Sequence, residues 1–153
     1  MNRFRGSLIV VFAFSIVLFS MVWLNIAGPA LAADHTKDSL DKVGELVAAK
    51  KAVLIDVREK VEWDAGHIQG AKFVPMSKLK GKLTDEQLLE LLPADKVLYL
   101  YCAGGYRCLD VAEMLEGRKL QLRALKQGYQ VLLKEGFPNE KPEAEKAEVR
   151  QAK

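Results

Sequence analysis

The sequence predicts one α/β domain in which a central, mainly parallel sheet is flanked by helices. Short apolar runs that suit strands alternate with segments of helical periodicity, which is the pattern of βαβ units. The run at 97–101, VLYLY, is apolar throughout, as expected for a strand buried on both faces of a sheet. The length of 153 residues suits one compact domain and is too short for two.

Helix and strand alternate in the first half of the domain. The predicted elements are a helix after Ser39, a strand at 53–55, a helix at 59–65 and a strand at 72–74. The first helix is predicted because four apolar residues share one helical face: Leu40, Val43, Leu46 and Val47. The apolar run at 53–55 ends at Asp56, and Gly66 and Pro75 end the two elements that follow.

The same alternation continues in the second half. The predicted elements are a helix from Thr84 through Leu92, a strand at 97–101, a helix at 107–117, a strand at 121–125 and a helix at 129–134. Thr84 and Gln87 have the spacing of a capping box, which predicts a helix start. We interpret the polar residues 33–38 as a loose segment. The lysines at 78, 80 and 82 are interpreted as a solvated face.

The first 32 residues have the pattern of an export signal. Arg3 and Arg5 precede an apolar stretch at 8–27, and Ala30-Leu31-Ala32 forms a small-residue site, so cleavage is predicted after Ala32. The alternative is an uncleaved membrane anchor, because about 20 apolar residues can span a bilayer. Both interpretations predict an exported domain, periplasmic or otherwise outside the cytoplasm. Membrane contact is expected only if the segment is uncleaved.

The rest of the chain divides into a domain at 33–138 and a charged tail at 139–153. The tail carries almost no large apolar side chains and is predicted to be disordered. Removing Arg3 and Arg5 from the 23 basic residues leaves a near balance with the 20 acidic residues. This balance gives no electrostatic basis for binding nucleic acid. His35 and His67 are far from both cysteines in sequence, so no metal site is expected.

The segment CAGGYR after the 97–101 strand carries the most specific chemistry. Ligands of open α/β sheets bind at the carboxyl ends of the strands, where Cys102 lies. Gly104 and Gly105 permit backbone angles that a side chain would forbid, and a helix starting near Arg107 points free N–H groups at the loop. Such a loop forms an anion nest, and a thiol held in it has a lowered pKa.

The length of this loop narrows the chemistry. The spacing from Cys102 to Arg107 is one residue shorter than in cysteine-dependent phosphatases, whose wider loop holds a tetrahedral phosphate. A tighter ring suits one additional sulfur on the thiolate, which is a persulfide. A phosphatase is therefore disfavoured.

Two separate stretches resemble the family of single-domain rhodaneses, which are sulfurtransferases. Cys102-Ala103-Gly104-Gly105-Tyr106-Arg107 matches the family's C-x-x-G-x-R loop. Leu54-Ile55-Asp56-Val57-Arg58, Glu62-Trp63 and the run from Gly66 to Ala71 match its D-V-R-x-x-x-E-aromatic-x-x-G-H-I-x-G-A pattern. Gly128-Tyr129 and Gly136-Phe137-Pro138 resemble its carboxyl end. The resemblance runs from about Ser39 to Pro138.

The resemblance implies a rhodanese-like three-layer fold and a mechanism without a cofactor. The Cys102 thiolate takes a sulfur from a donor such as thiosulfate, and the resulting persulfide is held by the amides of the loop at 103–107. An acceptor such as cyanide or a thiol then removes the sulfur. The expected partners are a small-molecule donor and acceptor, with a protein acceptor as an alternative.

Two interpretations stay open for each cysteine. Cys102 alone could be a small buried residue, although the glycines, the arginine and the second pattern favour catalysis. Cys108 shares a helical face with Val111, Ala112 and Leu115, which indicates packing. The family usually has a small or hydroxyl residue there. The departure leaves open a resolving thiol, or a disulfide with Cys102.

The residues near the other pattern are predicted to support the structure. Asp56 is expected to cap nearby backbone amides, and Arg58 and Glu62 have the spacing of an ion pair on a short helix. His67 is interpreted as a turn residue rather than a base. Arg107 is expected to add positive charge at the nest, and Tyr106 to line the mouth of the loop or to shield it.

The leading functional hypothesis is an exported sulfurtransferase. One rival is a non-enzymatic rhodanese-like module that carries sulfur or binds a protein. Another is a thiol-disulfide protein using Cys102 and Cys108, which their spacing disfavours because it is not C-x-x-C. The sequence identifies neither the physiological donor and acceptor nor the oligomeric state.

Overall fold

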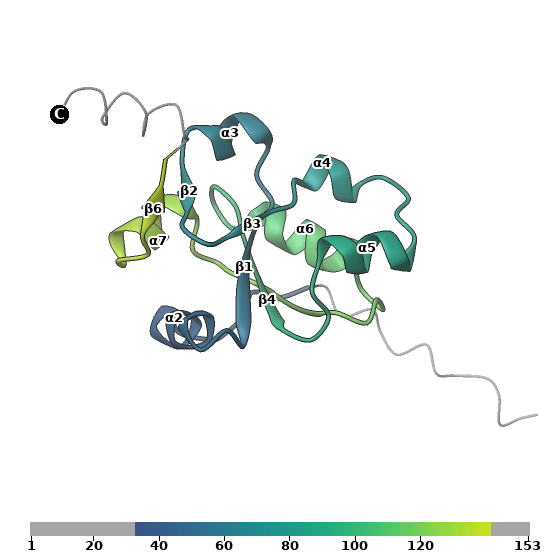
Figure 1. The fold of residues 1–153 in the computed structure, drawn as a ribbon, viewed down its shortest axis with the longest axis horizontal. Helices are drawn as coiled ribbons and strands as arrows, with labels where there is room; N and C mark the ends of the chain where they lie inside the picture. The colour runs from purple at the N-terminus through teal and green to yellow at the C-terminus, as the bar shows by residue number, and fades with distance from the viewer. Residues whose placement is uncertain (1–32, 142–153) are drawn as a thin grey trace, which may run out of the picture. The chain divides into compact units, whose positions relative to one another are not determined.

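Four parallel strands form the main sheet of the described residues, 33–141, in this computed structural model (Figure 1). Their order across the sheet is β3 (Lys72–Phe73), β1 (Ala52–Asp56), β4 (Val97–Tyr101) and β5 (Gln121–Ala124). Asp56 is level with Tyr101 in the register of β1 and β4, so both central strands end at the same edge. The predicted α/β class with a parallel sheet is confirmed.

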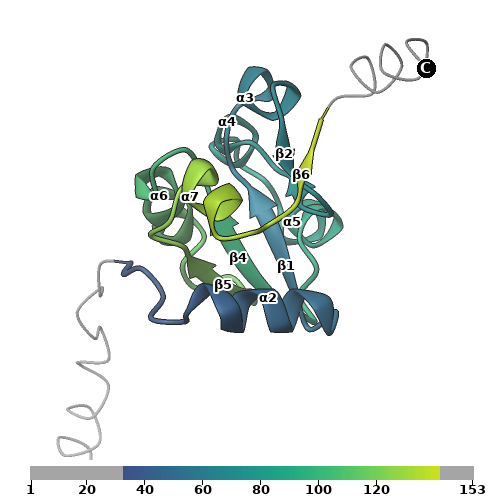
Figure 2. The same ribbon diagram turned by 90° about the vertical axis from the view of Figure 1, so that its left-hand side faces the viewer.

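Helices cover both faces of this sheet. One face carries α2 (Leu40–Ala48) and α7 (Tyr129–Lys134), which Figure 2 shows in front of the sheet. The other carries α4 (Met76–Leu79), α5 (Asp85–Leu91) and α6 (Tyr106–Met114). Leu98 and Leu100 of β4 pack toward α4, α5 and α6, whereas Tyr99 and Tyr101 pack toward α2 and α7. Burial on both faces explains the unbroken apolar run of β4.

Two short elements form a second sheet beside α7. The strand β2 (His67–Ile68) follows α3 (Lys60–Asp64) and pairs in antiparallel fashion with β6 (Asn139–Glu140). The Tyr129 hydroxyl donates to Asn139 Oδ1 at 2.8 Å and fixes this pair to α7. The prediction that the disordered tail begins at 139 is therefore wrong for Asn139 and Glu140, because tertiary pairing with β2 orders them.

The sequence interpretation also missed α4. Its lysines suggested a solvated face, but Met76 and Leu79 lie buried on the inner side of the same turn. The other predicted elements are present within a few residues of their bounds. The capping box of Thr84 and Gln87 is formed, with Gln87 N donating to Thr84 Oγ1 at 3.3 Å and Thr84 N donating to Gln87 Oε1 at 3.0 Å.

Residues 35–38, which we call the N-terminal strap, are held on the sheet edge. Thr36 N donates to the carbonyl of Ala124 at 2.8 Å, and His35 forms a parallel bridge with Ala124. Asp38 accepts hydrogen bonds from the Tyr99 hydroxyl at 2.7 Å and from Arg123. The expectation of a loose segment is therefore wrong, because main-chain pairing with β5 and the Asp38 contacts replace hydrophobic burial as the source of order.

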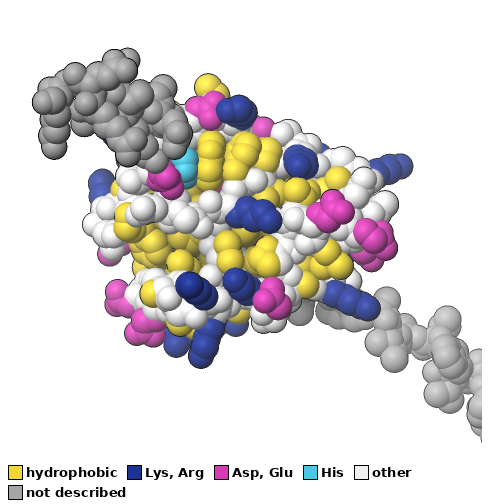
Figure 3. All heavy atoms as spheres, in the orientation of Figure 1, with side chains coloured by type: hydrophobic (Ala, Val, Ile, Leu, Met, Phe, Trp, Pro, Cys, Tyr) yellow, Lys and Arg dark blue, Asp and Glu magenta, His cyan; other side chains and the backbone are white. Residues whose placement is uncertain are grey.

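The predicted signal peptide or anchor at 1–32 and the tail at 142–153 lie outside the described residues. Within 33–141, no helix is both long enough and apolar enough to cross a membrane. On the face in Figure 3, basic and acidic side chains are interspersed and do not gather into a patch of one sign.

Candidate active site

Cys102 lies at the carboxyl edge of the sheet, directly after β4. Its side chain is 1% exposed, and the chain around it is fixed by main-chain hydrogen bonds. Tyr129 N donates to the carbonyl of Cys102 at 2.8 Å, and Val57 N donates to the carbonyl of Tyr101 at 3.0 Å. The end of β4 is thus held between α7 and the residue that follows β1. Ligands of open α/β sheets bind at this carboxyl edge of the strands.

The loop after Cys102 turns a backbone amide toward the sulfur. Gly105 N donates to Cys102 Sγ at 3.0 Å. Gly105 has a φ of 90°, and a Cβ there would lie 2.5 Å from the carbonyl oxygen of Lys126. Only glycine fits this position. The sequence expectation of special backbone angles holds for Gly105 and is wrong for Gly104, whose φ is not positive and whose missing Cβ faces open space.

The chain after β5 forms one wall of this loop. A Cβ on Gly128 would overlap the carbonyl oxygen of Ala103, so the backbone around 126–128 lies directly against the loop. In the sequence, Gly128 belongs to the stretch that resembles the carboxyl end of the rhodanese domain. The structure explains the glycine by this close approach of two backbones.

Electrostatics favour the thiolate of Cys102. Its pKa is lowered to about 5, first by a hydrogen bond from the Cys108 side chain and then by the amides of Gly104, Gly105 and Cys108, which outweigh the cost of burial. At neutral pH the sulfur is therefore an anion inside a nest of donors. The sequence predicted the nest but not the contribution of the Cys108 side chain.

Cys108 combines packing with a polar contact. Its side chain is buried in the core cluster beneath α6, and both cysteines are free thiols. The pKa of the Cys108 thiol is raised because it donates its hydrogen bond to the Cys102 sulfur and because it is buried. A thiol that keeps its proton is a poor nucleophile, so this geometry favours packing and donation over a resolving role.

Arg107 is fixed by Glu62, which the sequence analysis had paired with Arg58. Its guanidinium donates to both carboxylate oxygens of Glu62, at 2.7 and 2.8 Å. This bidentate pair joins the first turn of α6 to α3, and it lowers the pKa of Glu62 to about 2. The pKa of Arg107 is raised, first by Glu62 and further by Cys102. The predicted pair of Arg58 with Glu62 is therefore wrong, and Glu62 joins the site.

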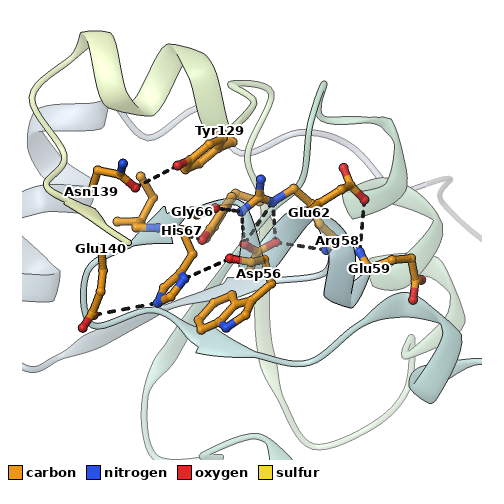
Figure 4. A network of polar contacts seen from close by, with 12 residues as sticks. Asp56, Arg58, Glu59, Glu62, Gly66, His67, Tyr129, Asn139 and Glu140 are labelled. Atoms are coloured by element: carbon orange, nitrogen blue, oxygen red, sulfur yellow. Dashed lines mark hydrogen bonds and ion pairs between the residues drawn. The ribbon is translucent and has the colours of Figure 1, made fainter. Parts of the chain in front are cut away.

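Arg58 pairs with Asp56 instead, in a fully buried contact (Figure 4). Arg58 Nη2 donates to Asp56 Oδ2 at 2.6 Å and to the carbonyl of Gly66 at 2.8 Å. The guanidinium also lies 4.0 Å from the centre of the Tyr129 ring. Asp56 caps a backbone amide as expected, since Arg58 N donates to its Oδ1 at 3.0 Å. Asp56 and Arg58 thus connect β1, β2 and α7 beneath the site.

His67 belongs to the neighbouring β2–β6 pair. Its ring stacks on Trp63 with 3.5 Å between ring centroids, and its Nδ1 donates to the carbonyl of Trp63 at 3.2 Å (Figure 4). Its Nε2 lies 3.8 Å from the carboxylate of Glu140. The interpretation of His67 as a turn residue is therefore wrong, because pairing with Glu140 places it in β2, where both ring nitrogens face structural partners.

The family follows from a comparison with known domains. A family model described as the rhodanese-like domain matches residues 39–139. The chain belongs to the rhodanese-like domain family. The single-domain interpretation and the predicted three-layer fold are thereby confirmed.

Curated relatives of this rhodanese-like domain include sulfurtransferases. It is 41% identical over 66 residues to the uncharacterized protein YqhL of Bacillus subtilis, covering 43% of this chain and 48% of that protein. It is 36% identical over 83 residues to the probable adenylyltransferase/sulfurtransferase MoeZ of Mycobacterium tuberculosis, covering 54% of this chain and 19% of MoeZ. The matched part thus spans about half or less of the length of these relatives.

Solved structures agree with the fold. A rhodanese-related protein from Thermoplasma volcanium superposes with a TM-score of 0.54 at 28% identity, covering 65% of this chain and 92% of that one. The human single-domain sulfurtransferase TSTD1 superposes with a TM-score of 0.53 at 27% identity, covering 63% and 94%. These similarities place the rhodanese-like domain in a family with sulfur-transfer members.

Other surfaces of the rhodanese-like domain lie apart from this chemistry. A groove of about 570 Å³ is lined by α2 and by the chain before β6, including Leu40, Val47, Phe137 and Pro138, and contains no residue of the Cys102 loop.

Within residues 33–141, no group of three or more His, Cys, Asp or Glu side chains is arranged to hold a metal ion. Tyr106, at the start of α6, is 79% exposed and adjoins the loop.

Proposed function

We propose that this protein is a sulfurtransferase that carries a sulfane sulfur on Cys102. One observation carries the proposal: Gly105 N donates to the buried Cys102 sulfur at 3.0 Å in a loop that lowers the thiol pKa to about 5. A thiolate is the reactive form of cysteine toward sulfur. The same amides that stabilise the thiolate suit the anionic outer sulfur of a persulfide.

Two displacements at sulfur complete the cycle. The Cys102 thiolate attacks the outer sulfur of thiosulfate, a new S–S bond forms, the S–S bond of thiosulfate breaks, and sulfite leaves with the electron pair. Cyanide or an acceptor thiolate then attacks the outer sulfur of the persulfide. Thiocyanate or a new persulfide leaves, and the Cys102 thiolate returns. Covalent storage divides one transfer into two steps, and neither step needs a general base.

We further propose that the domain works outside the cytoplasm, after export directed by residues 1–32, on a small-molecule donor and acceptor or on a protein acceptor. The export pattern of residues 1–32 supports this proposal. Cell fractionation, together with the amino-terminal sequence of the purified protein, tests it. An amino terminus at Ala33 is expected if the segment is cleaved.

The mass of the intact protein tests the sulfur step. Incubation of the full chain with thiosulfate should add one sulfur atom, and cyanide should remove it as thiocyanate. Cys102→Ala should gain no sulfur, whereas Cys108→Ser should still gain it. A panel of sulfur donors and thiol acceptors read in the same way would identify the preferred pair. Sulfur loading that persisted in Cys102→Ala, or its absence from the wild-type protein with every donor, would overturn the proposal.

A further inference from the structure

The N-terminal strap contacts the backbone of the Cys102 loop at one point. His35 Nε2 lies 3.2 Å from the carbonyl oxygen of Gly105, across 70 residues of sequence. A carbonyl oxygen can only accept a hydrogen bond, so Nε2 carries the hydrogen and donates it. Gly105 is also the residue whose N–H donates to Cys102 Sγ. The strap therefore contacts the same residue that contacts the sulfur.

We propose that His35 is a positioning residue of the active loop, which holds the carbonyl of Gly105 so that the amide of Gly105 stays directed at the sulfur of Cys102. The two backbone groups flank one Cα, so a contact that fixes the carbonyl restricts the whole residue. The restriction matters because glycine has the widest backbone freedom of any residue. The inference deepens the proposed sulfur transfer and rests on it for its functional meaning.

The packing around Gly105 supports this role. A Cβ on Gly105 would meet the carbonyl oxygen of Lys126 at 2.5 Å and His35 Nε2 at 3.3 Å. The loop is thus enclosed on one side by the chain after β5 and by the imidazole of the strap. Gly105 itself is buried, whereas Ala103 and Gly104 are exposed. The residue whose amide lies 3.0 Å from the sulfur is therefore held in place by the rest of the protein.

The strap is built firmly enough to position a side chain. Thr36 N donates to the carbonyl of Ala124 at 2.8 Å, immediately beside His35. Asp38 accepts from the Tyr99 hydroxyl, from Arg123 and from Thr36 Oγ1, and these contacts lower its pKa. Ser39 then caps α2 by accepting from Lys42 N at 3.2 Å. The carboxyl side of His35 is thus anchored to β4, β5 and α2.

Preorganised amides stabilise an anion without the cost of orienting them during the reaction. Without the His35 contact, Gly105 would sample other conformations, and its hydrogen bond to the sulfur would be formed for less of the time. The thiolate would then lose part of its stabilisation, and a larger share of Cys102 would be protonated in acid.

The test is the pH profile of Cys102 alkylation by iodoacetamide, with the modified residue identified by mass mapping. His35→Ala in the full chain should move the midpoint upward by about 0.5 to 1 pH unit, the effect of losing one hydrogen bond in the chain of contacts. At pH 5 the alkylation rate should fall about two- to fivefold. Lys37→Ala, an exposed change in the same strap, is the matched control and should follow the wild-type profile.

His35→Gln separates positioning from packing, because its amide nitrogen can still donate to the carbonyl of Gly105. It should restore most of the wild-type profile and remains informative if His35→Ala fails to fold. A wild-type profile in His35→Ala, or an equal shift in His35→Gln and His35→Ala at unchanged urea midpoints, would overturn the inference. Alkylation needs no sulfur donor, so failure of the proposed transfer would appear separately, as a wild-type protein that gains no sulfur.

Discussion

Cys108 lies with Cys102 in one core cluster and directs two donors at its sulfur, the backbone amide and, through a hydrogen bond, the buried thiol. The bond lowers the pKa of Cys102 and raises that of Cys108, so the two residues have opposite protonation states at neutral pH. This arrangement accounts for a cysteine where rhodaneses usually have a small or hydroxyl residue, because a hydroxyl could donate in the same way.

Replacing Cys108 should therefore separate donation from packing. Cys108→Ala removes the largest cause of the lowered pKa, so the alkylation midpoint of Cys102 should rise by about one pH unit and transfer at pH 5 should slow by about fivefold. Cys108→Ser retains a donor and should stay close to the wild type. If Cys108→Ser instead gains sulfur from the donor but does not pass it to the acceptor, Cys108 acts as a resolving thiol.

The rate of sulfur loading should rise with pH over the acid range. The folded pKa of Cys102 is lowered to about 5, so the reactive thiolate forms as pH rises through that value and is lost as pH falls below it. Loading from thiosulfate should increase about fivefold from pH 4 to pH 5 and level off above about 6. Stopped-flow loading between pH 4 and 9 measures this profile, and a midpoint near 8.5 would contradict the nest.

Glu62 should matter through Arg107. Glu62→Gln removes the charge that holds the guanidinium with two hydrogen bonds, so Arg107 should lose its fixed place beside the loop. We expect kcat/KM for thiosulfate to fall by about tenfold, equivalent to about 1.4 kcal/mol.

Asp64→Asn provides the matched control, because Asp64 and Lys60 form an exposed ion pair on the same helix, α3. Exposed pairs contribute about 0 to 1 kcal/mol to stability, so activity should change little. Equal effects of Glu62→Gln and Asp64→Asn on kcat/KM would show that Glu62 has no special role at the site.

The two glycines of the loop should respond differently to alanine. Gly105→Ala forces a Cβ against the carbonyl of Lys126 at a positive φ, so it should destabilise the domain by about 1–3 kcal/mol and disturb the amide that contacts Cys102. Gly104→Ala meets open space and should retain wild-type loading within about twofold. Urea unfolding and sulfur loading of both variants measure the contrast, which an equal loss in both would contradict.

Local signals predicted the elements that local forces determine. The bounds of β4 and α7 were predicted to the residue, because an apolar run and a glycine-flanked helix are visible in sequence. The capping box of Thr84 was equally visible. The strand β2 and its partner β6 were missed because neither lies in an apolar run of the sequence and each exists through pairing across the fold.

The site was predictable at its centre and less so at its edges. The spacing of Cys102, Gly105 and Arg107 predicted the nest, because these residues are adjacent in the chain. The partner of Arg107 could not be chosen locally, since Glu62 lies 45 residues away and its spacing to Arg58 suggested a different pair. His35 lies further still, on a strap whose polar sequence carries no sign of the carbonyl that it contacts.

The approach of Gly128 to Ala103 means that a second stretch of backbone, rather than a side chain, closes one side of the Cys102 loop. This wall depends on the absence of a side chain at residue 128, whereas the Cys108 side chain acts on the sulfur itself.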